Sequence, residues 1–381
     1  MTSTAHATTA APAEGAGDGL WQQLQLPLNS EIVFHESIEE VLFDVFDLDE
    51  ESPLERGFDP IHYLCSRESV AELVAAVELE IGGEELRRRN ANIAQKLSSV
   101  GGRIRRLRRL PATWRSELTS LQQDFPNFDG VIDYVRGMAA LAELGNGVIQ
   151  LDPIVFDGCP GSGKSVFAEQ LAQTVAGGFV RLQMSSAEAG AQIGGSAITW
   201  SNSSPGLIFS TLTSATYANQ LVLLDELDKT ASAPGERFSP IGPLYQLLER
   251  PAARSFRDQS VPGLCIDASP LLWVATTNDR TLLPAPILSR LHPFDIRLPH
   301  PSQAEQMVRS VMRRLVTEEP NIGRFRLGDD AVKKLSHSSP REIRGKLRRA
   351  CGSAALQSRW TISSVDVPDS KPQQRPIGFR P

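Results

Sequence analysis

The sequence lacks the features that mark several classes of protein. No apolar run approaches the roughly 20 residues that a membrane-spanning helix needs. Residues 1–6 do not combine a basic start with an apolar core, so we expect no secretory signal. The cysteines are far apart and form no C-x-x-C pair: Cys65, Cys159, Cys265 and Cys351. This cysteine usage argues against disulfides and a structural metal site, and it suits a reducing, cytoplasmic compartment.

The chain also lacks a strong net charge, but its charges are unevenly distributed. The net charge of −6 over 381 residues gives no overall signature of a nucleic-acid-binding protein. Residues 31–60 nevertheless hold eleven acidic side chains against the single base Arg56. Residues 87–109 hold nine basic side chains and no acidic one. The length allows two or three domains with a substantial core.

Apolar residues recur through the basic stretch at alternating spacings of three and four. The apolar positions are Leu86, Ile93, Leu97, Val100, Ile104 and Leu107, and the polar Asn90 completes the spacing. This heptad pattern predicts a long helix or a coiled-coil arm, although Gly101-Gly102 would weaken it by ~1 kcal/mol per glycine. Arg103 and Arg108 would repel their counterparts in a parallel pair, so we favour a partner helix within the acidic residues 31–60. A solvated or internally paired basic face is favoured over contact with nucleic acid, which is the alternative.

A phosphate-binding loop is the most informative motif of the chain. Residues 158–165 fit the pattern G-x-x-x-x-G-K-[ST] and read Gly158-Cys159-Pro160-Gly161-Ser162-Gly163-Lys164-Ser165. A short buried strand is predicted before the loop, at 153–157, and a helix after it, at 165–175. Glycines let backbone N–H groups approach phosphates, and the helix N-terminus adds positive potential. We expect Lys164 to reach the β- and γ-phosphates of ATP and Ser165 to hold Mg²⁺.

Acidic and amide side chains follow two further predicted strands. The apolar run 221–224 ends in Asp225-Glu226, about 60 residues beyond the phosphate loop. Asp225 is expected to hold Mg²⁺ through water together with Ser165, and Glu226 to deprotonate the attacking water. The strand at 271–275 leads to Asn278, whose amide suits hydrogen bonding to the γ-phosphate or to the water.

Two arginines complete the candidate catalytic set. Arg290, on a short helix that begins near Pro284, is suited to reach a neighbouring subunit's nucleotide as an arginine finger. Arg341 begins a later helix and is suited to contact the γ-phosphate from a lid. Each arginine alone would be interpreted as half of a surface ion pair, but their order and spacing favour the catalytic interpretation.

The coarse pattern from about residue 126 onward indicates an α/β fold. Strands are expected at 154–156, 179–182, 221–224 and 271–275, and helical stretches separate them. This alternation predicts a mostly parallel sheet that is covered on both faces. Helices are expected at 303–316, 329–336 and 340–358.

Together these residues resemble the AAA+ ATPases, and among them the ATPase module of Lon-type proteases, over residues 126–356. The motifs that carry the resemblance are the phosphate loop, Leu223-Leu224-Asp225-Glu226-Leu227-Asp228-Lys229, Leu247-Leu248-Glu249, Phe256-Arg257-Asp258, residues 274–278, residues 284–290 and the helix from Arg341. The resemblance implies a five-stranded parallel sheet, a small helical lid and a ring, often a hexamer, with ATP at the subunit interfaces. It also implies the roles of a Walker A pair (Lys164, Ser165), a Walker B pair (Asp225, Glu226), sensor 1 (Asn278), the arginine finger (Arg290) and sensor 2 (Arg341, with Arg344 as the fallback).

The sequence departs from the Lon pattern in two places. It ends soon after the lid, without the length of a Ser-Lys peptidase domain, so we expect no proteolysis by this chain alone. In the pore-loop region the family has an aromatic residue where this chain has Gln192, and an insertion at 195–203 follows. Trp200 in that insertion could grip a threaded polypeptide or pack as a loop aromatic, and the sequence leaves both interpretations open.

These inferences combine into one expected organisation and function. We expect a disordered N-terminus at 1–20, a mainly helical recognition domain at 21–125, a large AAA+ α/β domain at 126–300, a helical lid at 301–361 and a disordered tail at 362–381. The expected function is ATP binding and hydrolysis by a homo-oligomeric ring that remodels a protein client. The alternatives are an AAA+ motor or switch on nucleic acid and an ATP-dependent assembly scaffold.

Overall fold

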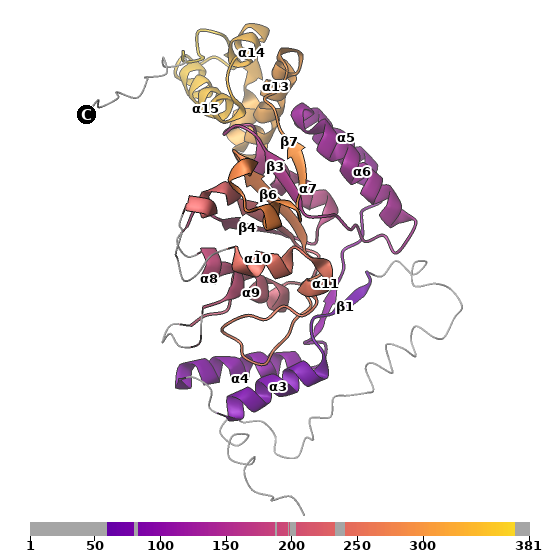
Figure 1. Ribbon diagram of the computed structural model, residues 1–381. Coiled ribbons are helices and arrows are strands. Elements are labelled where there is room, and N and C mark those ends of the chain that lie inside the picture. The colour runs from indigo at the N-terminus through magenta and orange to yellow at the C-terminus, as the bar shows by residue number, and fades with distance from the viewer. Residues whose placement is uncertain are drawn as a thin grey trace, which may run out of the picture.

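A five-stranded parallel sheet forms the centre of the molecule (Figure 1). The computed structural model describes residues 59–79, 83–186, 189–196, 198, 203–232 and 241–369. The strands, in the spatial order β4-β5-β6-β3-β7, are β4 (Phe179–Gln183), β5 (Leu221–Asp225), β6 (Leu272–Thr277), β3 (Ile154–Asp157) and β7 (His292–Asp295). All four neighbouring pairs are parallel. The predicted α/β fold with a five-stranded parallel sheet is confirmed, although no pattern in the sequence predicted β7.

Successive residues of the strands face opposite layers of helices. In β3, Ile154 and Phe156 belong to one buried cluster and Val155 to the other. In β5, Leu223 and Leu224 divide between the same two clusters. Because neither face of the sheet meets water at its centre, β3, β5 and β6 contain continuous apolar runs rather than alternating ones, whereas the edge strands β4 and β7 carry exposed polar residues.

Aromatic rings fill the layer on the first face of the sheet. This layer consists of α5 (Trp114–Asp124), the short 3-10 helix η1 (Pro126–Phe128), α6 (Asp129–Glu143) and α7 (Lys164–Val175). The ring of Phe128 stacks on that of Phe167, with 4.0 Å between ring centroids. Phe125 and Phe156 meet Phe167 edge-on at 5.3 and 5.6 Å. These contacts fix α5 and α6 against the helix that follows the phosphate loop.

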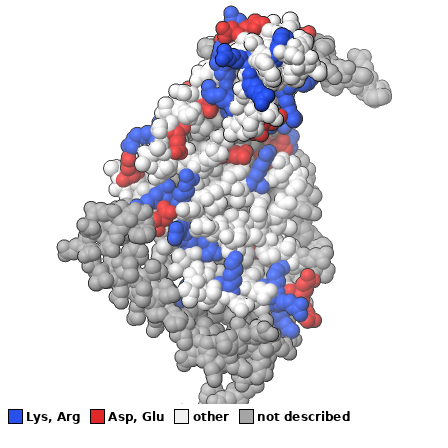
Figure 2. Space-filling model, turned by 180° about the vertical axis from the view of Figure 1, so that it is seen from behind, with Lys and Arg blue, Asp and Glu red and all other residues white. Residues whose placement is uncertain are grey.

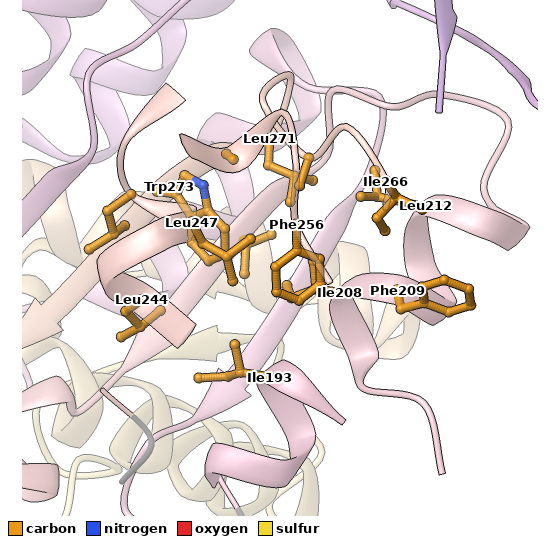
Figure 3. Close-up of a cluster of buried hydrophobic side chains, with 14 of the residues drawn as sticks. Ile193, Ile208, Phe209, Leu212, Leu244, Leu247, Phe256, Ile266, Leu271 and Trp273 are labelled. Atoms are coloured by element: carbon orange, nitrogen blue, oxygen red, sulfur yellow. The ribbon is translucent and has the colours of Figure 1, made fainter. Parts of the chain in front are cut away.

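Shorter helices cover the other face. They are α8 (Ala189–Gly194), α9 (Leu207–Ser214), α10 (Gly242–Leu247), α11 (Arg250–Ala253) and α12 (Ala285–Leu288), with the 3-10 helices η2 (Leu227–Ser232) and η3 (Arg280–Leu282). Their apolar side chains gather around Phe256, which is 1% exposed (Figure 3). Ile193, Ile208 and Leu247 point into this cluster from three different helices.

The N-terminal helices join the same core as these short helices. They are α3 (Arg67–Glu78) and α4 (Glu84–Ser98), flanked by the antiparallel pair β1 (Ile61–Tyr63) and β2 (Ile104–Arg106). Leu73 and Leu97 are buried in the cluster that contains Phe256. Within the described residues, α3 and α4 therefore have no separate core, and the expected division between residues 125 and 126 coincides with no gap in packing.

The predicted long helix or coiled-coil arm across residues 86–107 is wrong. Helix α4 ends at Ser98, and the chain reverses through Gly101, which has φ +71°. At Gly102 a Cβ atom would lie 2.0 Å from the carbonyl oxygen of Lys96, so only glycine fits this turn. Ile104 then enters β2, and the heptad pattern therefore combines a helix face with a strand.

The basic stretch is used inside the protein, where its arginines bond to backbone carbonyls at helix ends. Arg105 donates from Nε to Leu212 O at 2.8 Å, near the end of α9. Arg108 donates from Nη1 to Gln173 O at 2.8 Å, near the end of α7. Cations at helix C-termini satisfy carbonyls that lack intrahelical partners and oppose the helix dipole. The expected acidic partner helix lies in residues 31–60, almost all of which are outside the described residues.

The lid forms a third, smaller core. Its elements are α13 (Pro301–Glu318), η4 (Pro320–Arg324), α14 (Asp329–Leu335) and α15 (Pro340–Leu356), with the strand pair β8 (Arg326–Leu327) and β9 (Thr361–Ile362). Polar contacts tie the lid to α5: Gln306 Nε2 and Ser310 Oγ donate to Gln123 O at 2.8 and 3.5 Å, and Arg313 pairs with Asp124 at 2.5 Å.

The two ends of the chain differ in how far the structure describes them. The expected disordered segment 1–20 lies outside the described residues, as do residues 370–381 of the expected tail. Residues 362–369 of that tail pack against the lid instead, because Ile362 and Val367 are buried and Asp366 bonds to Arg359 at 2.6 Å. In the described part of the chain, no helix combines the length and apolarity that crossing a bilayer requires.

The aromatic cluster gives a test of the fold. We expect Phe128→Ala to lower the free energy of unfolding by about 3–5 kcal/mol, because it removes a fully buried ring and leaves a cavity between η1 and α7. Leu144→Ala, at a side chain that is 87% exposed, should change it by less than about 0.5 kcal/mol. Urea unfolding of both variants measures the difference, and equal midpoints would contradict this account of the core.

Candidate functional site

A cleft of about 870 Å³ lies between the carboxyl ends of the strands and the lid. Crevices at this edge of a parallel sheet are where open α/β folds bind ligands. Ten residues predicted for the site line it together: Pro160, Gly161, Ser162, Gly163, Lys164, Ser165, Asp225, Glu226, Asn278 and Arg341. Gly158 and Cys159, at the start of the phosphate loop, do not line it. Arg290 does not line it.

The phosphate loop presents backbone donors to this cleft. Gly161 and Gly163 have φ of +84° and +97°, a region that favours glycine. Helix α7 begins at Lys164 without a side-chain cap, so its first N–H groups are free to meet an anion. Lys164 Nζ donates to the carbonyl oxygens of Gly158 and Cys159, the latter at 3.0 Å. Burial lowers the pKa of Lys164, so bringing an anion close would favour its charged form.

Asp225 is the most enclosed of the acids that line the cleft, at 4% exposure. Its Oδ1 accepts hydrogen bonds from Ser165 Oγ at 2.8 Å and from Thr276 Oγ1 at 2.6 Å. Its Oδ2 pairs with Arg181 Nη2. Burial would raise the pKa of Asp225, but the bonds from Thr276, Ser165 and Arg181 outweigh burial and lower it. The carboxylate is therefore kept charged beside the hydroxyl with which it was predicted to share Mg²⁺.

The backbone of Glu226 is strained. Its φ of +59° is unusual for a residue with a side chain, and its N–H donates to Thr276 Oγ1 at 2.9 Å. The carboxylate accepts a hydrogen bond from Gln183 Nε2 at 3.2 Å, at the mouth of the cleft. Strain of this kind persists where surrounding contacts impose it and is concentrated at functional sites.

Asn278 lies between the phosphate loop and a buried acid. Its Oδ1 accepts from Lys164 Nζ at 3.4 Å, and its backbone N–H donates to Asp228 Oδ2 at 3.3 Å. Asp228 is 3% exposed. The sequence assigned no separate role to Asp228, although a third acidic residue two positions after the acidic pair was a usable signal.

The structure distinguishes the two arginines considered for the lid. The Cβ of Arg341 lies 3.8 Å from where a Cβ on Gly161 would be, so α15 begins directly above the phosphate loop. Arg344, in contrast, pairs with Glu318 on α13, with Nη1 to Oε1 at 3.2 Å. Arg341 is exposed to the cleft and has no ion-pair partner among the described residues. The position of Arg341 suits the predicted sensor role better than that of Arg344.

Arg290 is held outside the cleft of its own chain. Its Nη2 pairs with Glu249 Oε1 at 2.6 Å, and Nη1 donates to Pro286 O at 2.6 Å. The guanidinium also lies over the ring of Tyr245, 5.6 Å from its centroid. Arg290 thus makes no contact with the cleft of its own chain, and its role toward a second subunit stays a prediction.

The far end of the cleft is apolar and was missed by sequence reasoning. Met307, Val311 and Leu315 of α13 line it opposite Phe125. Arg314 lies over the Phe125 ring at 4.4 Å, and its buried Nη1 has no hydrogen-bond partner within the described part of the chain. Apolar walls with one unsatisfied donor suit a nucleobase. These residues come from segments almost 200 positions apart, so no local pattern could have joined them.

The donor set of the cleft fits ATP with Mg²⁺. Loop N–H groups and Lys164 supply contacts for phosphates, and the apolar end supplies a surface for the base. The described residues contain no group of three His, Cys, Asp or Glu side chains that could hold a metal ion by themselves. Mg²⁺ commonly takes one or two protein ligands and completes its shell with water and phosphate oxygens, so Ser165 and Asp225 suffice.

The pore-loop region is described only at its base. Ser204 N donates to Ser196 Oγ at 2.7 Å, and Asp258 Oδ2 accepts from Gly206 N at 2.7 Å, so both ends of the insertion are held together. Gln192 lies in α8, directly before Ile193 of the core. Trp200 lies outside the described residues, and both interpretations of its role stay open.

Comparison with known proteins agrees with this geometry. The family model "ATPase family associated with various cellular activities (AAA)" matches residues 154–301. A Lon protease of Frankia alni is 29% identical over 63% of this chain and 29% of its own length. Lon protease 4 of Sorangium cellulosum is 28% identical over 54% and 26%. The peroxisomal Lon protease homolog 2 of Arabidopsis thaliana is 34% identical over 43% and 18%.

The chain thus spans between 18% and 29% of the length of these curated relatives.

A solved structure of the RuvB Holliday junction branch migration motor of Thermotoga maritima aligns with a TM-score of 0.42 and 14% identity, over 62% of this chain and 66% of that one. The Lon relatives and the family model cover the region that holds the phosphate loop, β5 and β6. Residues 154–301 therefore form an AAA ATPase domain, in an AAA+ module that resembles the one in Lon proteases.

Proposed function

We propose that this chain binds ATP with Mg²⁺ in the cleft and hydrolyses it to ADP and phosphate. The observation that carries the proposal is the Ser165–Asp225 hydrogen bond at 2.8 Å, which joins the phosphate loop to the acidic end of β5 inside one cleft. Lys164 and the α7 N-terminus bind phosphate oxygens, and Ser165 and Asp225 hold the metal. When bound, Mg²⁺ neutralises charge on the phosphates.

Glu226 is the proposed general base. Its strained backbone and the bond from its own N–H to Thr276 Oγ1 direct the carboxylate toward the mouth of the cleft, where Gln183 orients it. The carboxylate takes a proton from the attacking water, while Asn278 and Arg341 contact the γ-phosphate or the water from two sides.

Substitution of the base gives the direct test of hydrolysis. We expect Glu226→Gln to lower kcat by about 10²–10⁴-fold, because an amide cannot take the proton, and to leave ATP binding nearly unchanged. Lys164→Ala should lose nucleotide affinity as well, since the phosphates lose their buried cation. Phosphate release and binding of a fluorescent ATP analogue measure the two effects, and Arg115→Gln, far from the cleft, is the control. Undiminished turnover in Glu226→Gln would show that the base is misassigned.

The proposed assembly is a homo-oligomeric ring in which Arg290 acts on the neighbouring subunit. Arg290 is held by Glu249 and Pro286 away from its own cleft, which supports an action in trans.

We expect Arg290→Ala to bind ATP normally and to lose about 10³-fold in kcat. In mixtures, Arg290→Ala subunits should regain part of their turnover beside Glu226→Gln subunits, which are inactive but carry an intact finger. Steady-state hydrolysis across mixing ratios measures this complementation. Additive rates with no recovery would refute the trans finger.

The proposed client of the ring is a protein, with residues 21–125 contributing to recognition, 126–300 forming the large domain and the lid following from 301. No peptide-bond cleavage is proposed. The free cysteines, of which Cys65 and Cys351 are buried, support a reducing cytoplasmic compartment. An unfolded polypeptide should then stimulate hydrolysis more than double-stranded DNA does.

The nucleic-acid alternative has little support from the basic stretch. Arg105 and Arg108 donate to backbone carbonyls near the C-terminal ends of α9 and α7. On the face drawn in Figure 2, basic side chains are scattered among acidic ones and gather most densely over the lid. Stimulation by DNA with a steep salt dependence would revive that alternative.

A further inference from the structure

Arg181 is the charged residue in the middle of the edge strand β4, between Val180 and Leu182. β4 pairs in parallel with β5 so that Gln183 lies opposite Asp225 and Arg181 opposite Leu223. Residues two apart in a strand share a face, so Arg181 and Gln183 both extend toward the cleft. Arg181 Nη2 pairs there with Asp225 Oδ2, and Arg181 is one of the residues that line the cleft.

The two oxygens of Asp225 have different kinds of partner. Oδ1 accepts from Ser165 Oγ and Thr276 Oγ1, which are short, neutral hydroxyl groups. Oδ2 is paired with a full positive charge on a long side chain that is 53% exposed. A half-exposed guanidinium can leave such a pair at modest cost, because water replaces the carboxylate as its partner.

Arg181 supplies the charge that a buried carboxylate needs. An ionised carboxylate at 4% exposure is costly unless a cation compensates it. The ammonium of Lys164 bonds to carbonyl oxygens of the loop and to Asn278, so it does not fill this place. Among the described residues, Arg181 is the cation that bonds to Asp225 directly.

We propose that Arg181 is a displaceable counter-ion of Asp225, which competes with the divalent metal for this carboxylate and lowers the metal affinity of the cleft. The inference rests on the proposed function in one respect, namely that Asp225 is a metal-binding residue. Two cations cannot both compensate one carboxylate fully, so each weakens the binding of the other. Arg181 is thus a positioning residue, and release from Asp225 frees its guanidinium on the phosphate side of the cleft.

Mn²⁺ alone, titrated into nucleotide-free protein, tests the competition without any turnover. The EPR signal of free Mn²⁺ reports binding. We expect Arg181→Gln to bind Mn²⁺ about fivefold more tightly than wild type, as removal of a half-exposed ion pair implies. Adding Asp225→Asn to Arg181→Gln should abolish the gain. Arg309→Gln is the matched control, because it removes a guanidinium of similar exposure (47%) that pairs with Asp329 outside the cleft.

An affinity in Arg181→Gln equal to or weaker than that of wild type would overturn the inference. A gain in Mn²⁺ affinity that persists when Asp225→Asn is added, or that Arg309→Gln also produces, would overturn it as well. Such a gain would come from the change in net charge and not from the Arg181–Asp225 pair. Thermal unfolding checks that the variants are folded. If Arg181→Gln does not fold, Arg181→Met, which keeps the apolar stem of the side chain on β4, provides the same test.

Failure of this inference can be told apart from failure of the proposed function. If wild type binds and hydrolyses ATP but Mn²⁺ affinity does not change in Arg181→Gln, only the counter-ion role is lost. If wild type neither binds nor hydrolyses ATP, the proposed function fails, whereas the Mn²⁺ comparison still reports on the Arg181–Asp225 pair.

Discussion

The buried carboxylate of Asp225 joins the main parts of the site. It ends β5, accepts from Ser165 at the start of α7, accepts from Thr276 at the end of β6, and pairs with Arg181 on β4. One charged group is therefore hydrogen-bonded or ion-paired to three neighbouring strands and to the helix after the phosphate loop. A buried polar network of this kind is stabilising only while every member is satisfied. The geometry of the cleft consequently depends on the protonation and pairing of a single side chain.

The N-terminal segment is integrated into the AAA module by two kinds of interaction. Apolar residues of α3 and α4 enter the core around Phe256, and arginines of the basic stretch bond to the last carbonyls of α7 and α9. Leu97 is an example of the first kind, because it packs in the core, and Arg105 of the second, because it caps the end of a helix. A displacement of α4 and β2 would therefore also disturb the C-terminal end of α7, the helix whose N-terminus lies in the phosphate loop.

Much of the fold could be predicted because its signals are local. The phosphate loop, the apolar strands and the acidic pair Asp225-Glu226 each occupy a short stretch with a known physical meaning. The failures have non-local causes. The heptad pattern after Leu86 crossed a reversal at Gly102, β7 contains Pro293 and little apolar sequence, and the apolar end of the cleft joins Phe125 to a helix from another part of the chain. Pairing such as that of Arg181 depends on strand order, which composition does not encode.

Two helices begin at the same small volume. α7 starts at Lys164 within the phosphate loop, and α15 starts at Pro340, where Ser339 Oγ lies 3.7 Å from the position that a Cβ on Gly161 would take. The N-terminal end of α7 has no side-chain cap and keeps its partial positive charge of about half a unit, whereas the Glu342 carboxylate in the capping box of α15 offsets the charge at that end. An anion at the phosphate loop would therefore attract the lid chiefly through the guanidinium of Arg341, which lines the same cleft. By thermodynamic reciprocity, whatever draws the lid inward would then also strengthen binding of the anion.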